Sequence, residues 1–153
     1  TALDVTIQGQ ILHEMQKLTR DSGAALIWIT HDLSVVAALA DRIAVMYAGR
    51  KVEIGPVRDV IRNPRHPYTI VLLSTRGHGG RLSGKRLPAI PGSPPDLANL
   101  PPGCAFAPRC ALVNDACRAA APPPVSISDS HQVRCYRTDQ TVQEPHAHAP
   151  VAG

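Results

Sequence analysis

Apolar and polar positions follow a helical period at the start of the chain. From Asp4 to Ser22, apolar side chains recur at helical spacing, and charged and amide side chains occupy the opposite face. Asp4 is a suitable N-cap and Gly23 a suitable stop signal, so the pattern predicts one amphipathic helix. Its apolar face carries Ile7, Ile11, Leu12, Met15 and Leu18.

The pattern changes over Ala24–Thr30, a run of apolar, branched and aromatic residues. A run of this length and composition is typical of a strand buried on both faces. It stops at His31-Asp32, and small apolar residues then predict a short helix over Leu33–Ala40, capped by Asp32 or Ser34. A helix that feeds a buried strand is half of a βαβ unit, which indicates an α/β fold.

Short elements with clear boundaries follow. A strand over Arg42–Tyr47 and a strand over Arg50–Ile54 are joined by Ala48-Gly49, which turns the chain into a hairpin. Gly55-Pro56 ends the hairpin. Two short helices are then predicted, separated by prolines that break helical pairing. They cover Val57–Arg62 and Tyr68–Ser74.

Composition divides the chain into a patterned first part and a proline-rich second part. Of 15 prolines, 12 lie at Pro88 or later, and all four cysteines lie at Cys104 or later. The Gly-rich, polar stretch 77–85 predicts a linker between a domain over residues 1–76 and an extension over residues 86–136. Proline density makes regular helix unfavourable over residues 88–102, and residues 137–153 have the composition of a disordered tail. The extension has little aromatic bulk for a core, which favours an added cross-link.

The four cysteines are the candidates for that cross-link. Cys104, Cys110, Cys117 and Cys135 have the spacing C-x5-C-x6-C-x17-C. Disulfides are disfavoured in a reducing cytoplasm, whereas thiolate ligation of a metal stabilises a segment that cannot fold by burial alone. The residues leave the metal open, because neither the tight C-x2–4-C pairs of structural zinc nor the common C-x2-C spacing of iron–sulfur clusters occurs. His131 is a spare ligand.

His31 directly follows the predicted buried strand, where open α/β sheets place ligand-contacting groups. Position alone allows two interpretations: a helix-start residue that bonds the backbone, or a residue that contacts a ligand. The neighbouring residues favour the second. The run ITHDLSVVAALADRIAVMYAGRKVEIG closely resembles the segment after the Walker B strand in ATP-binding subunits of ABC transporters. The resemblance implies that His31 is the switch histidine, which contacts the γ-phosphate of ATP.

Three further segments carry the resemblance. Thr1, Ala2, Leu3 and Asp4 look like the D-loop, which crosses the interface between two ATP-binding subunits. The sequence NPRHPYT, at Asn63–Thr69, looks like a signature of the oligopeptide/dipeptide branch. The pattern IPG-SPPDL-LPPGC and the cysteines that follow it look like the C-terminal extension of that branch. The resemblance covers about residues 1–136 and implies the C-terminal half of a P-loop NTPase domain, followed by a mostly irregular extension.

Cofactors and partners are implied by the same resemblance. A complete subunit binds ATP and Mg²⁺, pairs with a second ATP-binding subunit and drives peptide uptake through transmembrane permease subunits, with a peptide-binding protein as an indirect partner. Such subunits are peripheral proteins on the cytoplasmic face of the inner membrane. In some members the cysteines of the extension hold an iron–sulfur cluster. The resemblance therefore favours a [4Fe–4S] cluster at the four cysteines, with zinc as the alternative.

Several motifs of that family do not occur in the sequence. There is no G-x-x-x-x-G-K-[ST] phosphate-binding loop, no LSGGQ-like signature and no Asp-Glu pair of the Walker B type. We therefore expect the chain to be a fragment that hydrolyses no ATP by itself. Two other interpretations stay open: a stand-alone metal or iron–sulfur module over Arg86–Tyr136, and a non-functional remnant of a truncated gene.

Charge and hydropathy bear on other classes of partner. The net charge is +4 and the isoelectric point is near 9.1, but the basic residues are scattered and lack interleaved aromatic residues, so no nucleic-acid partner is predicted. No apolar run reaches the roughly 20 residues that a membrane span needs, and no signal-peptide pattern occurs. These features predict a soluble intracellular protein.

Overall fold

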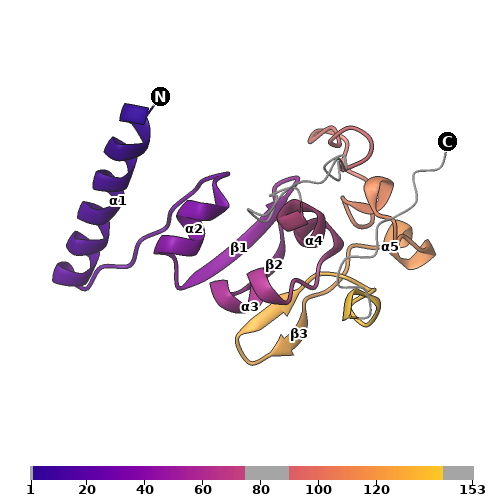
Figure 1. Cartoon of the computed structure of the whole chain (residues 1–153). Coiled ribbons are helices and arrows are strands. Elements are labelled where there is room, and N and C mark those ends of the chain that lie inside the picture. The colour runs from indigo at the N-terminus through magenta and orange to yellow at the C-terminus, as the bar shows by residue number, and fades with distance from the viewer. Residues whose placement is uncertain (1, 75–89, 143–153) are drawn as a thin grey trace, which may run out of the picture. The chain divides into compact units, whose positions relative to one another are not determined.

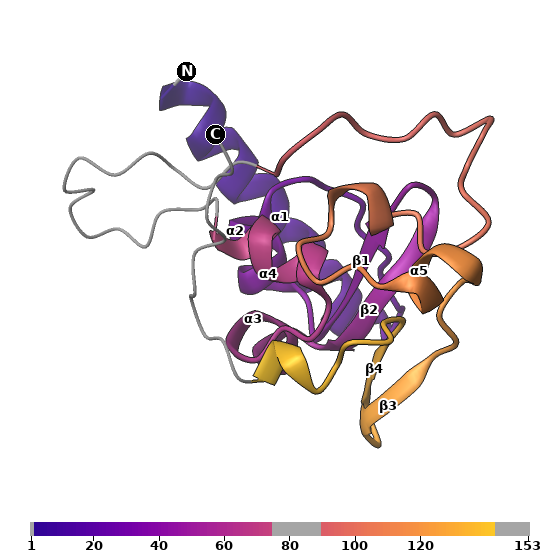
Figure 2. The same cartoon turned by 90° about the vertical axis from the view of Figure 1, so that its right-hand side faces the viewer.

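The computed structural model describes residues 2–74 and 90–142, with side chains from residue 9 onward. The chain divides into two units, residues 1–41 and 42–153, and each is considered separately below. Most helices and strands are labelled in Figure 1, and β4 is labelled in Figure 2. No helix in the described ranges is long and apolar enough to cross a membrane.

The first unit contains two helices close to those predicted from the sequence. Helix α1 covers Ala2–Ser22 and therefore begins before the predicted Asp4 cap. Gly23 ends it with a φ of 67°, a left-handed conformation that glycine adopts without strain. Helix α2 covers Leu33–Leu39. The Gln16 side-chain amide donates a hydrogen bond to the carbonyl oxygen of Ala38 (3.2 Å), which joins the two helices.

The predicted strand over Ala24–Thr30 is wrong for this structure. The segment lacks strand pairing, and the side chains of Ile27 and Ile29 are 89% and 94% exposed. A strand needs a neighbour to receive its backbone hydrogen bonds, and a doubly buried strand also needs packing on both faces. Within residues 2–74 and 90–142, no strand pairs with this segment. The βαβ unit expected from it is therefore not formed by the described residues.

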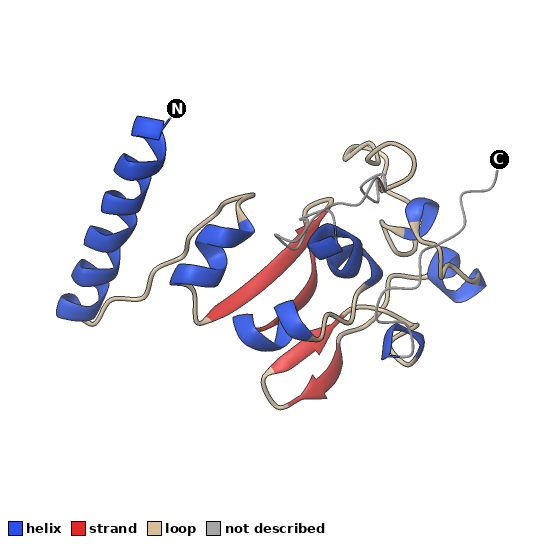
Figure 3. Cartoon of the chain, in the orientation of Figure 1, coloured by secondary structure: helices blue, strands red, loops and turns tan. Residues whose placement is uncertain are grey.

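The second unit is built on a four-stranded antiparallel sheet in the order β1-β2-β4-β3. Figure 3 shows these strands in red. Strands β1 (Arg42–Tyr47) and β2 (Arg50–Pro56) form the predicted hairpin. Strand β2 continues past its predicted end at Ile54, because Gly55 and Pro56 still pair with β1. Strands β3 (Val125–Ser128) and β4 (His131–Val133) form a second hairpin, which joins the first through β4. The proline-rich extension thus adds two strands to the sheet that the first part of the chain begins.

The first hairpin turns at Ala48 and Gly49, which have φ angles of 49° and 73°. Positive φ at both central residues is typical of the two-residue turns whose twist matches that of the flanking strands. Tyr47 pairs with Arg50 across the turn, and the register shifts between Val45 and Met46. Alternate residues of β1 are buried, which places the side chain of Tyr47 in the core.

Two helices follow the hairpin. Helix α3 covers Val57–Arg62, as the sequence predicts, and packs on β1 and β2 through the buried Val57 and Val60. Asn63 ends it, ahead of Pro64. Helix α4 covers Pro67–Ser74 and begins one residue before its predicted start.

The extension is mostly irregular, with short helices and the second hairpin. No helix forms over the described residues 90–102, as proline density predicts. The 3₁₀ helix η1 covers Ala107–Arg109, helix α5 covers Asp115–Ala119 and the 3₁₀ helix η2 covers Gln140–Val142. The predicted linker over residues 77–85 lies outside the described residues, as does most of the disordered tail predicted over residues 137–153. Residues 137–142 of that tail are described and are ordered instead: Gln140–Val142 form η2, and Thr141 is buried.

An aromatic cluster joins the extension to the first hairpin. Phe106 is 2% exposed, and its ring centroid lies 5.2 Å from that of Tyr47, in an edge-to-face arrangement, and 5.5 Å from that of Tyr68. The Arg109 guanidinium adds hydrogen bonds to the hydroxyl of Tyr47 (3.2 Å) and the carbonyl of Pro91 (2.7 Å). Figure 2 shows the segment around α5 beside β1 and β2. One phenylalanine thus anchors the aromatic-poor extension in a core shared with the hairpin.

Candidate functional site

His31 occupies a bend between the extended segment and α2, and it is exposed. The bend is held by its neighbours: the Asp32 amide donates to the Thr30 hydroxyl oxygen (2.9 Å), and the Asp32 carboxylate accepts from the Ser34 amide (2.8 Å). The second bond caps α2 as the sequence predicts. The helix-start role therefore belongs to Asp32, which leaves His31 at the solvent-facing position of the bend.

The predicted D-loop residues lie at the start of the chain. Ala2, Leu3 and Asp4 belong to the first turn of α1, and Thr1 lies outside the described residues. The four cysteines predicted to bind a metal belong to the second unit, residues 42–153.

The four cysteines lie at three places in the extension. Cys104 precedes η1, Cys110 caps its C-terminus, Cys117 lies in α5, and Cys135 follows β4. All four are free thiols; Cys117 and Cys135 are buried and the other two are partly buried. The side chain of Asn114 caps α5 by accepting a hydrogen bond from the Cys117 amide (3.0 Å).

Gly103 allows two of these elements to approach closely. The Cys104 amide donates to the Cys117 carbonyl oxygen (2.8 Å). A Cβ atom at Gly103 would lie 2.2 Å from that same oxygen and 2.6 Å from the carbonyl oxygen of Arg118. Only glycine fits between these backbones, so the approach of Cys104 to Cys117 depends on it.

The four thiols lie close enough to influence one another electrostatically. The pKa of Cys110 is raised to about 11 and that of Cys135 to about 12, mainly by burial and in smaller part by the charge of the other ionised thiols. Burial also raises the pKa of Cys104, which the Arg50 guanidinium opposes. Thiols with such pKa values are protonated at neutral pH, so any metal that binds them must displace protons.

The types of the four side chains favour a metal site, but their arrangement in the structure does not. Four thiols from one compact region are the donors that zinc and iron–sulfur clusters use. Within residues 2–74 and 90–142, however, no three His, Cys, Asp or Glu side chains are grouped so that they could hold a metal ion. The described residues therefore do not form a metal site in this structure, although the four thiols belong to one region of the extension.

His131, the spare ligand expected from the sequence, has another partner. Its Nε2 atom lies 2.8 Å from Oε1 of Glu53, and both side chains are almost fully buried. Its ring also packs against Gly55, where an added Cβ would lie 3.1 Å from the ring. His131 therefore holds β4 against β2 and is committed to that contact.

Glu53 is a buried acidic residue that the sequence analysis did not single out. Its carboxylate accepts hydrogen bonds from the amides of Arg65 (2.7 Å) and His66 (3.0 Å) in addition to its contact with His131. His66 is 1% exposed, its Nδ1 accepts from the Tyr68 amide (3.1 Å), and burial lowers its pKa to about 4. The sequence does contain a signal for Glu53, because a glutamate stands there between two apolar residues of a predicted strand.

Comparison with known proteins relates these features to a family. Residues 52–117 match the family described as "Oligopeptide/dipeptide transporter, C-terminal region". That range contains most of β2, the NPRHPYT segment and three of the four cysteines. The chain carries the C-terminal region of the oligopeptide/dipeptide transporter family.

Relatives extend the match over most of the chain. A candidate peptide import ATP-binding protein of Brucella ovis is 55% identical over 142 residues, which cover 90% of this chain and 42% of that protein. The oligopeptide transport ATP-binding protein OppD of Mycobacterium tuberculosis is 51% identical over 91% of the chain and 23% of its own length. The dipeptide transport ATP-binding protein DppD of Bacillus subtilis is 46% identical over the whole chain and 44% of its own length. The chain thus spans less than half the length of these relatives.

Proposed function

We propose that this chain forms the C-terminal part of the ATP-hydrolysing subunit of an importer of short peptides. Support comes from its similarity to peptide, oligopeptide and dipeptide transport ATP-binding proteins over about nine-tenths of its length or more. The subunit would pair with a second ATP-binding subunit and with membrane permeases, at the cytoplasmic face of the membrane. It would work indirectly with a peptide-binding protein.

The observation that carries this proposal is the position of His31. Its side chain is exposed at a bend fixed by Thr30 and Asp32, so the imidazole can donate a hydrogen bond to a phosphate oxygen without breaking a structural contact. Such a donor would orient the γ-phosphate and the attacking water and would stabilise charge that develops during phosphoryl transfer. The phosphate-binding loop and the Mg²⁺ ligands would come from the rest of the subunit, as would the general base.

In the same proposal, Thr1, Ala2, Leu3 and Asp4 act at the interface between two ATP-binding subunits. This role is the one that the D-loop has in the family. It would connect the two ATP sites, because each site of such a pair is completed by the other subunit.

Peptide uptake in cells tests the proposal. The chain would be joined behind the N-terminal part of Bacillus subtilis DppD and expressed in cells that lack their own DppD. We expect growth on a dipeptide that supplies a required amino acid, and no growth with the 153-residue chain alone. Failure of a well-expressed fusion to restore uptake, or restoration by the chain alone, would contradict the proposal.

We also propose that Cys104, Cys110, Cys117 and Cys135 hold a [4Fe–4S] cluster. Support comes from the donor set: four free thiols lie in one short extension, and thiolates are the ligands that such clusters use. When bound, the cluster would supply four iron–thiolate bonds that tie η1, α5 and the end of β4 together. The residues of the chain would do the rest: Gly103 permits the close approach of two ligands, and Asn114 orients the helix that carries a third.

Metal analysis of protein purified without oxygen tests the cluster. We expect iron and sulfide in equal amounts, and a loss of both when any one of the four cysteines is replaced by serine. Ser128→Ala, at an exposed position of β3, is the control and should retain both. Stoichiometric zinc without sulfide would replace the cluster with a zinc site. Absence of both metals would refute this assignment and the alternative of a stand-alone metal module.

A further inference from the structure

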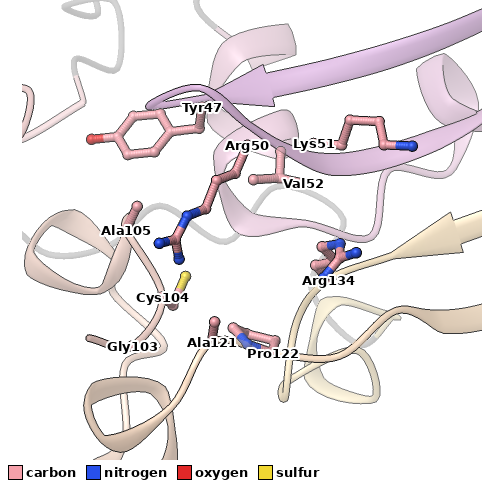
Figure 4. A pocket seen from close by; sticks show the side chains of 10 residues that line it. All are labelled: Tyr47, Arg50, Lys51, Val52, Gly103, Cys104, Ala105, Ala121, Pro122 and Arg134. Atoms are coloured by element: carbon pink, nitrogen blue, oxygen red, sulfur yellow. The ribbon is translucent and has the colours of Figure 1, made fainter. Parts of the chain in front are cut away.

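A pocket of about 350 Å³ opens between the first hairpin and the extension, within the second unit. Its lining contains three basic side chains and no carboxylate. Figure 4 shows Arg50 reaching from β2 toward Cys104, and Arg134 facing the same space from the end of β4. Lys51 lies at the rim and points away from Cys104. The basic pocket, as we call it, is defined by Arg50, Lys51 and Arg134.

The backbone fixes the two arginines on opposite sides of the basic pocket. Arg134 donates its amide proton to the Val52 carbonyl oxygen (2.8 Å), which continues the pairing of β4 with β2. Arg50 sits at the first position of β2, directly after the turn. The sheet therefore fixes the backbone positions from which both arginine side chains extend.

In the part of the chain that the structure describes, these cations have no acidic partner. Among the described residues, no carboxylate lies within salt-bridge distance of Arg50, Lys51 or Arg134. The carboxylate of Glu53, the next residue along β2, is already occupied by His131 and by two backbone amides. Like charges gathered without a counter-charge repel one another, and a bound anion relieves that repulsion.

The walls of the basic pocket limit the kind of anion. Val52 and Pro122 are buried apolar neighbours of the arginines, and Ala105 adds to the same wall. The volume lies within the range typical of small-molecule sites and leaves space beyond a single phosphate group. Arginine forks suit planar or tetrahedral oxyanions, and two arginines favour a doubly charged group over a singly charged one.

We propose that the basic pocket binds a small organic phosphate. Arg50 and Arg134 would hold its phosphate group from two sides, Lys51 would add a longer-range attraction at the rim, and the apolar wall would contact its organic part. This proposal does not depend on ATP hydrolysis. Because Cys104 also lines the basic pocket, binding is tested on protein without a metal at the cysteines.

Titration calorimetry with phenyl phosphate at low ionic strength tests the proposal on the 153-residue chain. We expect saturable binding, weaker binding of inorganic phosphate and benzoate, and none of phenol. Because a hydrogen bond to a charged group contributes appreciably, Arg50→Gln and Arg134→Gln should each weaken binding about tenfold or more. Arg58→Gln, at an exposed position of α3 outside the basic pocket, should leave the affinity unchanged.

A second pair of variants keeps the test independent of the arginines. Ala121 lines the basic pocket and is exposed, so Ala121→Glu places a carboxylate at its edge and should abolish binding. Ala119→Glu changes the net charge equally at an exposed position outside the lining. It should retain most of the affinity. Folding of each variant is checked by its cooperative thermal unfolding.

Three results would overturn the proposal. The first is a parent chain that unfolds cooperatively but shows no saturable binding. The second is equal affinity in the arginine variants and in Arg58→Gln. The third is tighter binding of benzoate than of phenyl phosphate, which would assign the basic pocket to carboxylates instead.

Discussion

Glu53 and His131 are 78 positions apart in sequence, and their side chains meet at 2.8 Å in the interior of the second unit. The contact joins β2 to β4, and the same carboxylate holds the backbone of Arg65 and His66 ahead of α4. One buried acid therefore fixes three segments: the hairpin, the NPRHPYT loop and the extension.

Replacing that acid should destabilise the second unit strongly. In Glu53→Gln the amide keeps one oxygen acceptor but turns an NH₂ group toward donors, so a buried polar contact is lost. We expect a decrease of about 3 kcal/mol in the free energy of unfolding in urea. Asp129→Asn, in the exposed β3–β4 turn, should change it by less than about 0.5 kcal/mol. Equal stability of both variants would contradict a structural role for Glu53.

Stability should also depend on pH through His66. Burial lowers the pKa of this histidine to about 4, whereas in the unfolded chain it is near 6.5. The unfolded state then binds the proton more readily, so the stabilisation is complete above pH 6.5 and is lost as the pH falls toward 4. The difference between the two pKa values corresponds to a loss of roughly 3 kcal/mol in the free energy of unfolding.

The variant His66→Asn isolates this effect. Asparagine can keep the acceptor for the Tyr68 amide but does not titrate in this range. At neutral pH the variant should be less stable than the parent, because the imidazole ring beside Phe106 is lost. Between pH 6.5 and 4 the unfolding free energy of the variant should change less than that of the parent. Parallel pH profiles for the parent and the variant would show that another group is responsible.

The turn at Ala48 offers a stabilising change. Ala48 has a φ of 49°, a conformation that costs a residue with a Cβ about 1 kcal/mol relative to glycine. Ala48→Gly should therefore raise the free energy of unfolding by up to about 1 kcal/mol, reduced by the greater freedom of glycine in the unfolded chain. Thermal unfolding measures the change. A clear loss of stability would indicate that the turn has a different conformation in solution.

Gly103 should tolerate no side chain. A Cβ there would overlap the Cys117 carbonyl oxygen, so Gly103→Ala must separate the two backbones that carry Cys104 and Cys117. We expect a loss of about 2–3 kcal/mol in unfolding free energy. Gly9→Ala is the control, because its Cβ meets nothing within 4 Å and alanine favours helix α1. A Gly103→Ala variant as stable as the parent would be inconsistent with this packing.

Local sequence signals predicted the elements that depend on neighbours in the chain. The Asp32 cap, the Ala48-Gly49 turn and the ends of α3 each follow from a few adjacent residues, and the structure has them. The Ala24–Thr30 strand required partners that the described residues do not provide, so hydrophobicity alone gave the wrong prediction. Strands β3 and β4 were missed because their place depends on distant pairing with β2.

The candidate site was likewise predicted only in part from the sequence. Residue types and motif spacing identified His31 and the four cysteines as candidate functional residues. They did not reveal that His131 is bound to Glu53, or that Arg50 and Arg134 face one pocket, because both relations arise only when the extension folds onto the hairpin.

The central proposal is that His31 contacts the γ-phosphate during ATP hydrolysis, and steady-state ATPase kinetics test it most directly. In the fusion with the N-terminal part of Bacillus subtilis DppD, His31→Ala should lower kcat by about 100-fold or more, with a much smaller change in ATP affinity, because the contact strengthens in the transition state. His13→Ala, which removes an exposed histidine of α1, should leave kcat unchanged. A His31→Ala fusion that hydrolyses ATP at the parent rate would contradict the account.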